Sequence, residues 1–158
     1  MFDFEKFTEN LSEDVVESSK LEMTSNDEFE KTPYGVYEVE VDEMSMKRSK
    51  KTDKKMLYIR FSILTGEKER FKLFYYKPYE TEWSFMRHDA SKMLASLLND
   101  RSEERVNQIN AILKEMTNDE EFIDEVFSYI LGRYEYQLNY YEEKGFDQFI
   151  IEDVFELE

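Results

Sequence analysis

Hydrophobic and polar residues alternate with a period of two in three segments that follow one another in the first half of the chain. The segments are residues 37–42, 57–63 and 70–77. Because successive side chains of a strand point to opposite faces, each segment is predicted to be a strand with one buried face. Three consecutive strands with short connections predict a meander.

Helical spacing replaces the alternation after Pro78. Apolar residues then recur every three or four positions in three stretches, which predicts a three-helix insert over residues 83–131. Thr117 and Glu120 have the spacing of a capping box and predict the start of the third helix. Gly132 suits the position after its end, where a positive φ is favoured.

The alternation returns over residues 134–140, and a turn at 142–145 leads to a last strand at 148–155. The predicted order is therefore three strands, a three-helix insert and a two-strand closing hairpin. This is the element order of an OB-fold, although other α+β meanders share it. We expect an α+β, five-stranded OB-like antiparallel barrel formed by residues 31–158 as a single domain.

Residues 1–30 differ from the remainder, since they are rich in Asp, Glu, Ser and Thr. Phe2, Phe4, Phe7 and Leu11 have spacings that suit a short amphipathic helix, which could dock on its own domain or on a partner. The composition also suits a mobile acidic N-terminal arm. Both interpretations are open at this point.

Charge is distributed very unevenly along the chain. The formal net charge is -16, yet residues 47–77 contain eleven Lys or Arg against three acidic residues. Six of these basic residues fall within nine positions, in the segment that joins the first two predicted strands. A chain divided in this way can present a cationic surface to a polyanion.

The predicted fold places this basic loop where OB-folds clasp their ligands, beside the outward faces of strands 2 and 3. Aromatic rings can stack on unpaired bases while Lys and Arg contact phosphates, so the sequence predicts a site for single-stranded DNA. The predicted site residues are Lys47, Arg48, Lys50, Lys51, Lys54, Lys55, Tyr58, Arg60, Lys72, Phe74 and Tyr76.

Structural explanations exist for the same residues. A lysine-rich loop is often only the solvated tip of a hairpin. The three rings would have a packing role if the helical insert covered that face of the sheet. The acidic remainder of the chain would also oppose binding to nucleic acid.

Two parts of the chain carry recognisable strand motifs. The first part, residues 33–64, has a Pro-x-Gly-x-Tyr-x-Val entry, the Lys-rich loop and a Met-Leu-x-Ile-x-Phe-x-Ile strand. The second comprises Tyr136-Gln-Leu-Asn-Tyr140, Lys144-Gly-Phe146 and Ile151-Glu-Asp-Val-Phe155. In both parts the chain resembles a group of small phage early proteins encoded in replication and recombination clusters. The group has no established function, and single-stranded-DNA binding is assigned to some members. The resemblance implies a phage protein with replication or recombination proteins as further partners.

Catalytic and cofactor motifs are absent from the sequence. The four glycines form no phosphate-binding loop, and without cysteines the single histidine, His88, cannot anchor a zinc site or a cysteine triad. We therefore expect no enzyme activity, no cofactor and no metal. No signal sequence or membrane-spanning run is evident, which predicts a protein of the cytoplasm, in the host if the gene is phage-encoded.

The acidic residues support a rival hypothesis. Carboxylates in residues 13–30 and 119–125 could imitate the phosphates of DNA. The chain would then be an acidic DNA mimic that inhibits a host nuclease or a CRISPR effector. Acidic residues also suit solvated surfaces and helix N-termini, so this pattern has a structural explanation as well.

Overall fold

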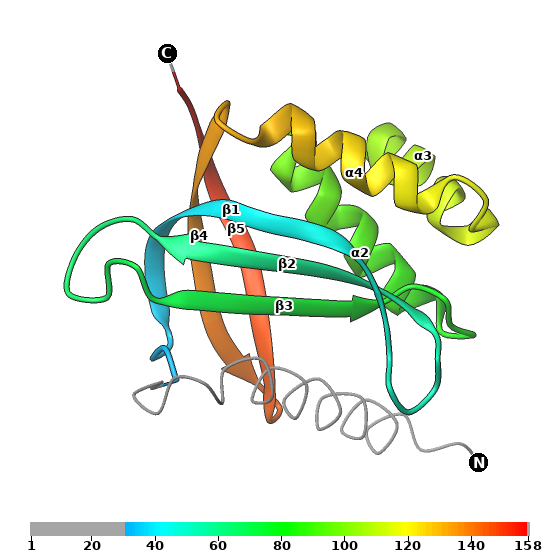
Figure 1. The fold of residues 1–158 in the computed structure, drawn as a ribbon, viewed down its shortest axis with the longest axis horizontal. Coiled ribbons are helices and arrows are strands. Elements are labelled where there is room, and N and C mark those ends of the chain that lie inside the picture. The colour runs from blue at the N-terminus through cyan, green and yellow to red at the C-terminus, as the bar shows by residue number, and fades with distance from the viewer. Residues whose placement is uncertain (1–30, 158) are drawn as a thin grey trace.

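The computed structural model describes residues 31–157, which form an α+β arrangement of five strands and three helices (Figure 1). This confirms the predicted class and the order of three strands, three helices and two strands. The predicted acidic arm at 1–30 lies outside the described residues. The elements are β1 Gly35–Arg48, β2 Lys55–Ile63, β3 Lys72–Pro78, α2 Ser84–Leu97, α3 Glu103–Glu115, α4 Asp119–Ile130, β4 Tyr134–Glu143 and β5 Phe146–Glu156.

The sheet is antiparallel with strand order β3-β2-β1-β4-β5. Strand β1 belongs to both halves of the sheet. Its first part, Gly35–Val39, pairs with β4, and its second part, Val39–Arg48, pairs with β2. Val39 is the crossing point and aligns with Ile63 on one side and Tyr136 on the other. In Figure 1, β4 and β5 cross the direction of β2 and β3 steeply. The long first strand therefore joins two differently oriented parts of one sheet.

The sheet is not closed within the described residues, where β3 and β5 are its two edges. The edges nevertheless approach through their side chains. The ring of Tyr75 on β3 meets that of Phe149 on β5 edge to face, with 5.4 Å between centroids. Phe61 on β2 stacks near the same Phe149 ring at 6.3 Å. The sheet thus curls enough for aromatic contact between its ends.

A single hydrophobic core fills the space between the inner face of the sheet and the helices. Most residues on the inward face of the strands are buried there, such as Val39, Ile59 and Leu138, whereas Tyr37, Phe71 and Tyr134 are partly buried against it. The three helices contribute buried apolar residues that include Leu94, Ile109 and Ile123. The hydroxyl of Tyr136 donates to the carbonyl oxygen of Leu97 at 2.7 Å. This bond satisfies one of the carbonyls left open at the end of α2, and so fastens that helix to β4.

The predicted capping box at the start of α4 is wrong. The Thr117 hydroxyl donates back to the Glu115 carbonyl at 3.3 Å, and Asn118 is the N-cap residue without a side-chain bond. Met116, which precedes them, has a left-handed backbone conformation with a φ of 52° and changes the direction of the chain. The helix therefore begins one residue later than predicted, and Thr117 lies one position before the N-cap. The prediction for Gly132 is confirmed, since its φ is 75°.

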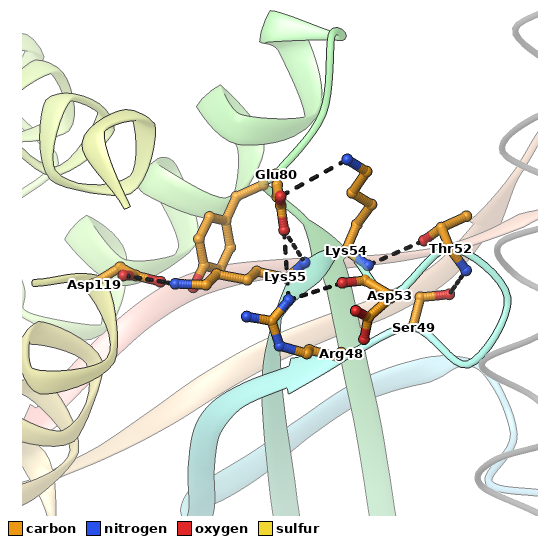
Figure 2. Close-up of polar contacts among 9 residues, drawn as sticks. Arg48, Ser49, Thr52, Asp53, Lys54, Lys55, Glu80 and Asp119 are labelled. Carbon is orange, nitrogen blue, oxygen red and sulfur yellow. Dashed lines mark hydrogen bonds and ion pairs between the residues drawn. The ribbon is translucent and has the colours of Figure 1, made fainter. Parts of the chain in front are cut away.

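A buried polar cluster attaches α4 to β2. Lys55 Nζ lies 3.1 Å from both carboxylate oxygens of Asp119 (Figure 2). The Tyr79 hydroxyl donates to the same carboxylate. Burial alone would raise the pKa of Asp119, but the hydrogen bonds from Tyr79 and Lys55 outweigh it, and the pKa is lowered. The folded protein therefore favours the charged carboxylate, and this preference stabilises the folded state.

We predict that Asp119→Asn lowers the free energy of unfolding by on the order of 3 kcal/mol at pH 7, because it leaves the Lys55 ammonium largely buried without its carboxylate. Urea denaturation measures the loss. Since the pKa of Asp119 is lower in the folded state, its stabilisation is present above the unfolded pKa and is lost as pH falls through the folded one. The difference between wild type and variant should therefore shrink below about pH 4.

Asp124→Asn is the matched control, because Asp124 lies exposed on the same helix and loses the same charge. It should change stability by less than about 0.5 kcal/mol. Equal effects of the two substitutions would show that the cluster at Asp119 contributes no particular stability.

Candidate nucleic-acid interface

The basic segment forms a tight hairpin rather than a long loop. Strand β1 extends to Arg48 and β2 begins at Lys55, so only residues 49–54 connect them. Lys47, Arg48 and Lys55 were predicted as loop residues, and the structure corrects this by placing all three on strands. Because neighbouring side chains on a strand alternate between faces, the six predicted cations cannot form one continuous patch.

The turn of this hairpin is ordered by Ser49, which is buried. Its hydroxyl accepts the N–H groups of Lys51 and Thr52, at 3.3 and 3.4 Å, and its carbonyl accepts the N–H of Asp53 at 2.8 Å. Asp53 has a φ of 58°, a left-handed conformation that Asp tolerates better than most residues. Serine and aspartate are suited to such turns because their short side chains bond to nearby backbone.

Two of the cations belong to the side that faces the helices. Lys55 is held by Asp119, as described above. Arg48 donates to the Asp53 carbonyl at 2.9 Å and lies 3.9 Å from the carboxylate of Glu80. Glu80 also accepts the backbone N–H of Lys55 at 2.9 Å (Figure 2). Arg48 and Lys55 therefore serve to fix the base of the hairpin.

The tip of the hairpin carries the exposed cations. Lys50, Lys51 and Lys54 are all exposed, and the ammonium of Lys54 lies 3.8 Å from Glu80 with 57% of its side chain accessible. The hairpin projects beyond the ends of β2 and β3 (Figure 1). Such a tip can reach a partner that the remainder of the sheet does not touch.

Tyr58 is the clearest correction to the predicted site. It was predicted to stack on bases, but its side chain is fully buried, with 0% exposed. Its ring packs against that of Tyr76 on β3, with 4.9 Å between centroids, and the ammonium of Lys47 lies 4.0 Å above it. The residue does point to the predicted outer face, since Ile59 and Leu57 are in the core. On this face Tyr58 supports its neighbours instead of meeting a ligand.

A charge triad occupies the middle of the same face. Both Arg60 Nε and Lys72 Nζ lie 2.5 Å from the carboxylate of Asp42, one at each oxygen. Arg60 also pairs with Glu43 at 3.1 Å. The Asp42 hydrogen bond is the main reason why the pKa of Arg60 is raised. These two predicted phosphate ligands are present on the outer face but are neutralised by carboxylates of β1.

The remaining predicted aromatic residues keep accessible surface. Phe74 and Tyr76 on β3 are half-buried on the outer face, whereas Leu73 and Tyr75 between them are buried. The predicted strand parity is therefore confirmed. The structure brings together Lys47, Tyr58, Arg60, Lys72, Phe74 and Tyr76 on one face and sets Lys50, Lys51 and Lys54 at its end.

Sequence reasoning missed the carboxylates that pair with these cations. Asp42 stood in an alternating run of acids, which identified its strand face but not its partners. Those partners depend on the β-bulge between Val41 and Glu43, which shifts the register with β2. Glu80 and Asp119 lie 25 and 64 residues from Lys55 in sequence, and no local pattern connects them.

Within residues 31–157, no group of three or more His, Cys, Asp or Glu residues has a geometry that could hold a metal ion. None of the helices described here is both long and apolar enough to cross a bilayer.

Comparison with known proteins identifies the family of this chain but no characterised relative. No curated protein and no solved structure matches the chain. Residues 16–97 match the model of DUF669, a family described as of unknown function. The match covers strands β1 to β3 and ends with α2, so it includes the basic hairpin and the outer face. Because it spans just over half of the sequence, the chain belongs to the DUF669 family.

Proposed function

We propose that this chain is a non-catalytic, phage-type protein that binds single-stranded DNA. The observation that carries the proposal is the exposed lysine tip, Lys50, Lys51 and Lys54, at the end of a face with two accessible rings, Phe74 and Tyr76. Phosphates would lie along the tip while bases stack on the rings. Proteins that bind single strands commonly combine cations for the phosphates with aromatic rings for the bases. Arg60 and Lys72 would contact the backbone between these two regions.

An OB-like architecture supports this proposal. Strand β1 pairs with both β2 and β4, the helices lie between β3 and β4 in sequence, and the edge strands meet through Tyr75 and Phe149. These are features of a five-stranded OB barrel that remains partly open. The proposed site then corresponds to the strand 2–3 face and the loop between strands 1 and 2, where OB-folds bind oligonucleotides. The protein would act in the host cytoplasm alongside replication or recombination proteins.

Neutralising the tip should weaken binding mainly through electrostatics. We predict that Lys50→Gln with Lys54→Gln lowers affinity for an oligo-dT of about 30 nucleotides and reduces the slope of log affinity against log salt by about 1 to 1.5. Fluorescence anisotropy at about 50 and 200 mM salt measures both quantities.

The matched control is Lys114→Gln with Lys144→Gln, which removes the same charge from exposed positions at the end of α3 and in the β4–β5 turn. This double variant should retain affinity and salt slope. If the two double variants bind alike, the tip is not the phosphate contact.

A second prediction concerns the triad. Asp42→Asn removes the carboxylate that pairs with both Arg60 and Lys72, so these cations can contact phosphates more strongly than in the wild type. We expect about three- to tenfold tighter oligo-dT binding at low salt, as one further charge-assisted contact would give. The same anisotropy titration measures it.

Glu38→Gln is the control for this gain, because Glu38 is exposed on the same strand and its loss changes net charge equally. A general reduction of repulsion would tighten binding in both variants. Equal gains would therefore argue against contact at Arg60 and Lys72, and a decrease with Asp42→Asn would contradict the proposed face.

The alternative function, a DNA mimic that inhibits a host nuclease or CRISPR effector, rests on one observation. Glu120, Glu121, Asp124 and Glu125 are all exposed on α4, while Asp119 beside them is buried. Replacing these four exposed acids by Gln or Asn would abolish inhibition of a nuclease if they imitate phosphates. For a single-strand binder the same variant should bind oligo-dT at least as tightly as wild type, because repulsion decreases.

A further inference from the structure

A cleft lies between the two open edges of the sheet, on the side where the helices pack. It is bounded by β3, the adjoining faces of α2 and the start of α3, and by β5, and its volume is about 690 Å³. This is within the range of roughly 300–1,000 Å³ that is typical of small-molecule sites. The cleft does not include the hairpin tip or the triad at Asp42.

The floor of the cleft is apolar and aromatic. Tyr75 and Phe149 meet edge to face there, and Met93, Val106 and Ile151 complete it. Phe149 is only half-buried, whereas the other four are largely covered. A planar, weakly polar group could therefore lie against the accessible part of the Phe149 ring.

Basic side chains line one wall of the cleft. His88 and Lys92 are one turn apart on α2 and so present neighbouring side chains. Among the described residues, neither the His88 side chain nor the Lys92 ammonium forms an ion pair or hydrogen bond with another side chain. Lys77 lies deeper, 3.8 Å from Asp89, and burial lowers its pKa while Asp89 opposes that effect. Arg101 also lines the cleft and donates to the carbonyl of Ile151.

The acidic residues of the cleft are largely engaged. Asp89 pairs with Lys77. Asp147 accepts the hydroxyls of Tyr34, at 2.6 Å, and Tyr140, at 3.0 Å. Glu103 sits in the first turn of α3, where the helix dipole favours a negative charge. Lys92 and Arg101 are therefore the charges of the cleft that carboxylates offset least.

We propose that this cleft binds a nucleotide, with its base on the Phe149 side of the floor and its phosphate between Lys92, His88 and Arg101. An extended peptide paired to the edge of β5 fits less well, because Arg101 already occupies the Ile151 carbonyl that such a strand would use. The nucleotide could be free or part of a DNA strand, and both sources share this chemistry. The site is independent of the hairpin tip.

Calorimetric titration of the full chain with dTMP tests the proposal, with thymidine as the ligand that lacks the phosphate. We expect dTMP to bind at least about tenfold more tightly than thymidine, since the charge-assisted phosphate contacts are lost. Lys92→Gln should weaken dTMP about five- to tenfold. Lys114→Gln, an equally exposed lysine on α3 outside the cleft, should leave binding unchanged.

Absence of dTMP binding would overturn the proposal, and so would equal effects of the two substitutions. Lys92 is exposed on its helix, so its replacement should not disturb folding, and an unchanged melting temperature checks this. The double variant Lys50→Gln with Lys54→Gln separates this site from the proposed function, because it should keep its dTMP affinity whatever happens to oligo-dT binding.

Competition between dTMP and oligo-dT shows whether the cleft takes a free nucleotide or a nucleotide of a DNA strand. If saturating oligo-dT displaces dTMP and Lys92→Gln also weakens oligo-dT, the cleft accepts a nucleotide of the strand. If dTMP binds equally well with and without oligo-dT, the cleft takes free nucleotides. Either result, together with the loss in Lys92→Gln, supports the site.

Discussion

The double pairing of β1 is the constraint on which the remaining structure depends. This strand uses both of its edges, first with β4 and then with β2, and Val39 at the crossing is fully buried. The bulge that follows adds one residue and so restores an inward position for Met44 while Asp42 remains outside. One local irregularity thus shapes the sheet and also brings a carboxylate to Arg60 and Lys72.

The sequence predicts the elements well because periodicity and burial act locally. Strand parity on β3 and β4 and the stripes of the three helices followed from apolar spacing alone, and the core confirms them. The start of α4 was mispredicted because a left-handed Met116 moved the cap by one residue. Such a shift depends on how the α3–α4 connection is packed, which no short window of sequence contains.

The candidate site was less predictable, since its chemistry depends on pairs that are distant in sequence. A count of charges found the basic segment but treated its six cations as equivalent. The structure divides them: Lys55 is enclosed by Asp119 and Tyr79, and Arg48 faces Glu80. Lys47 lies over the Tyr58 ring, and the other three lysines are at the tip. Likewise, the alternation of β2 placed Tyr58 on the outer face correctly. Alternation shows to which face a side chain points, but it does not show whether neighbouring side chains bury it.

Two binding surfaces can coexist on this sheet because its edges are not joined. A closed barrel would pair the backbones of β3 and β5 and leave little room between them. Here only the rings of Tyr75 and Phe149 meet, and the helices α2 and α3 turn polar residues toward the gap that remains. The outer face and the cleft share strand β3. Phe74 belongs to the outer face, Tyr75 and Lys77 line the cleft, and Tyr76 of the outer face also borders the cleft. A ligand on Phe74 and Tyr76 would therefore lie close to one beside Tyr75, so occupancy of either surface should restrict the motion of the same strand.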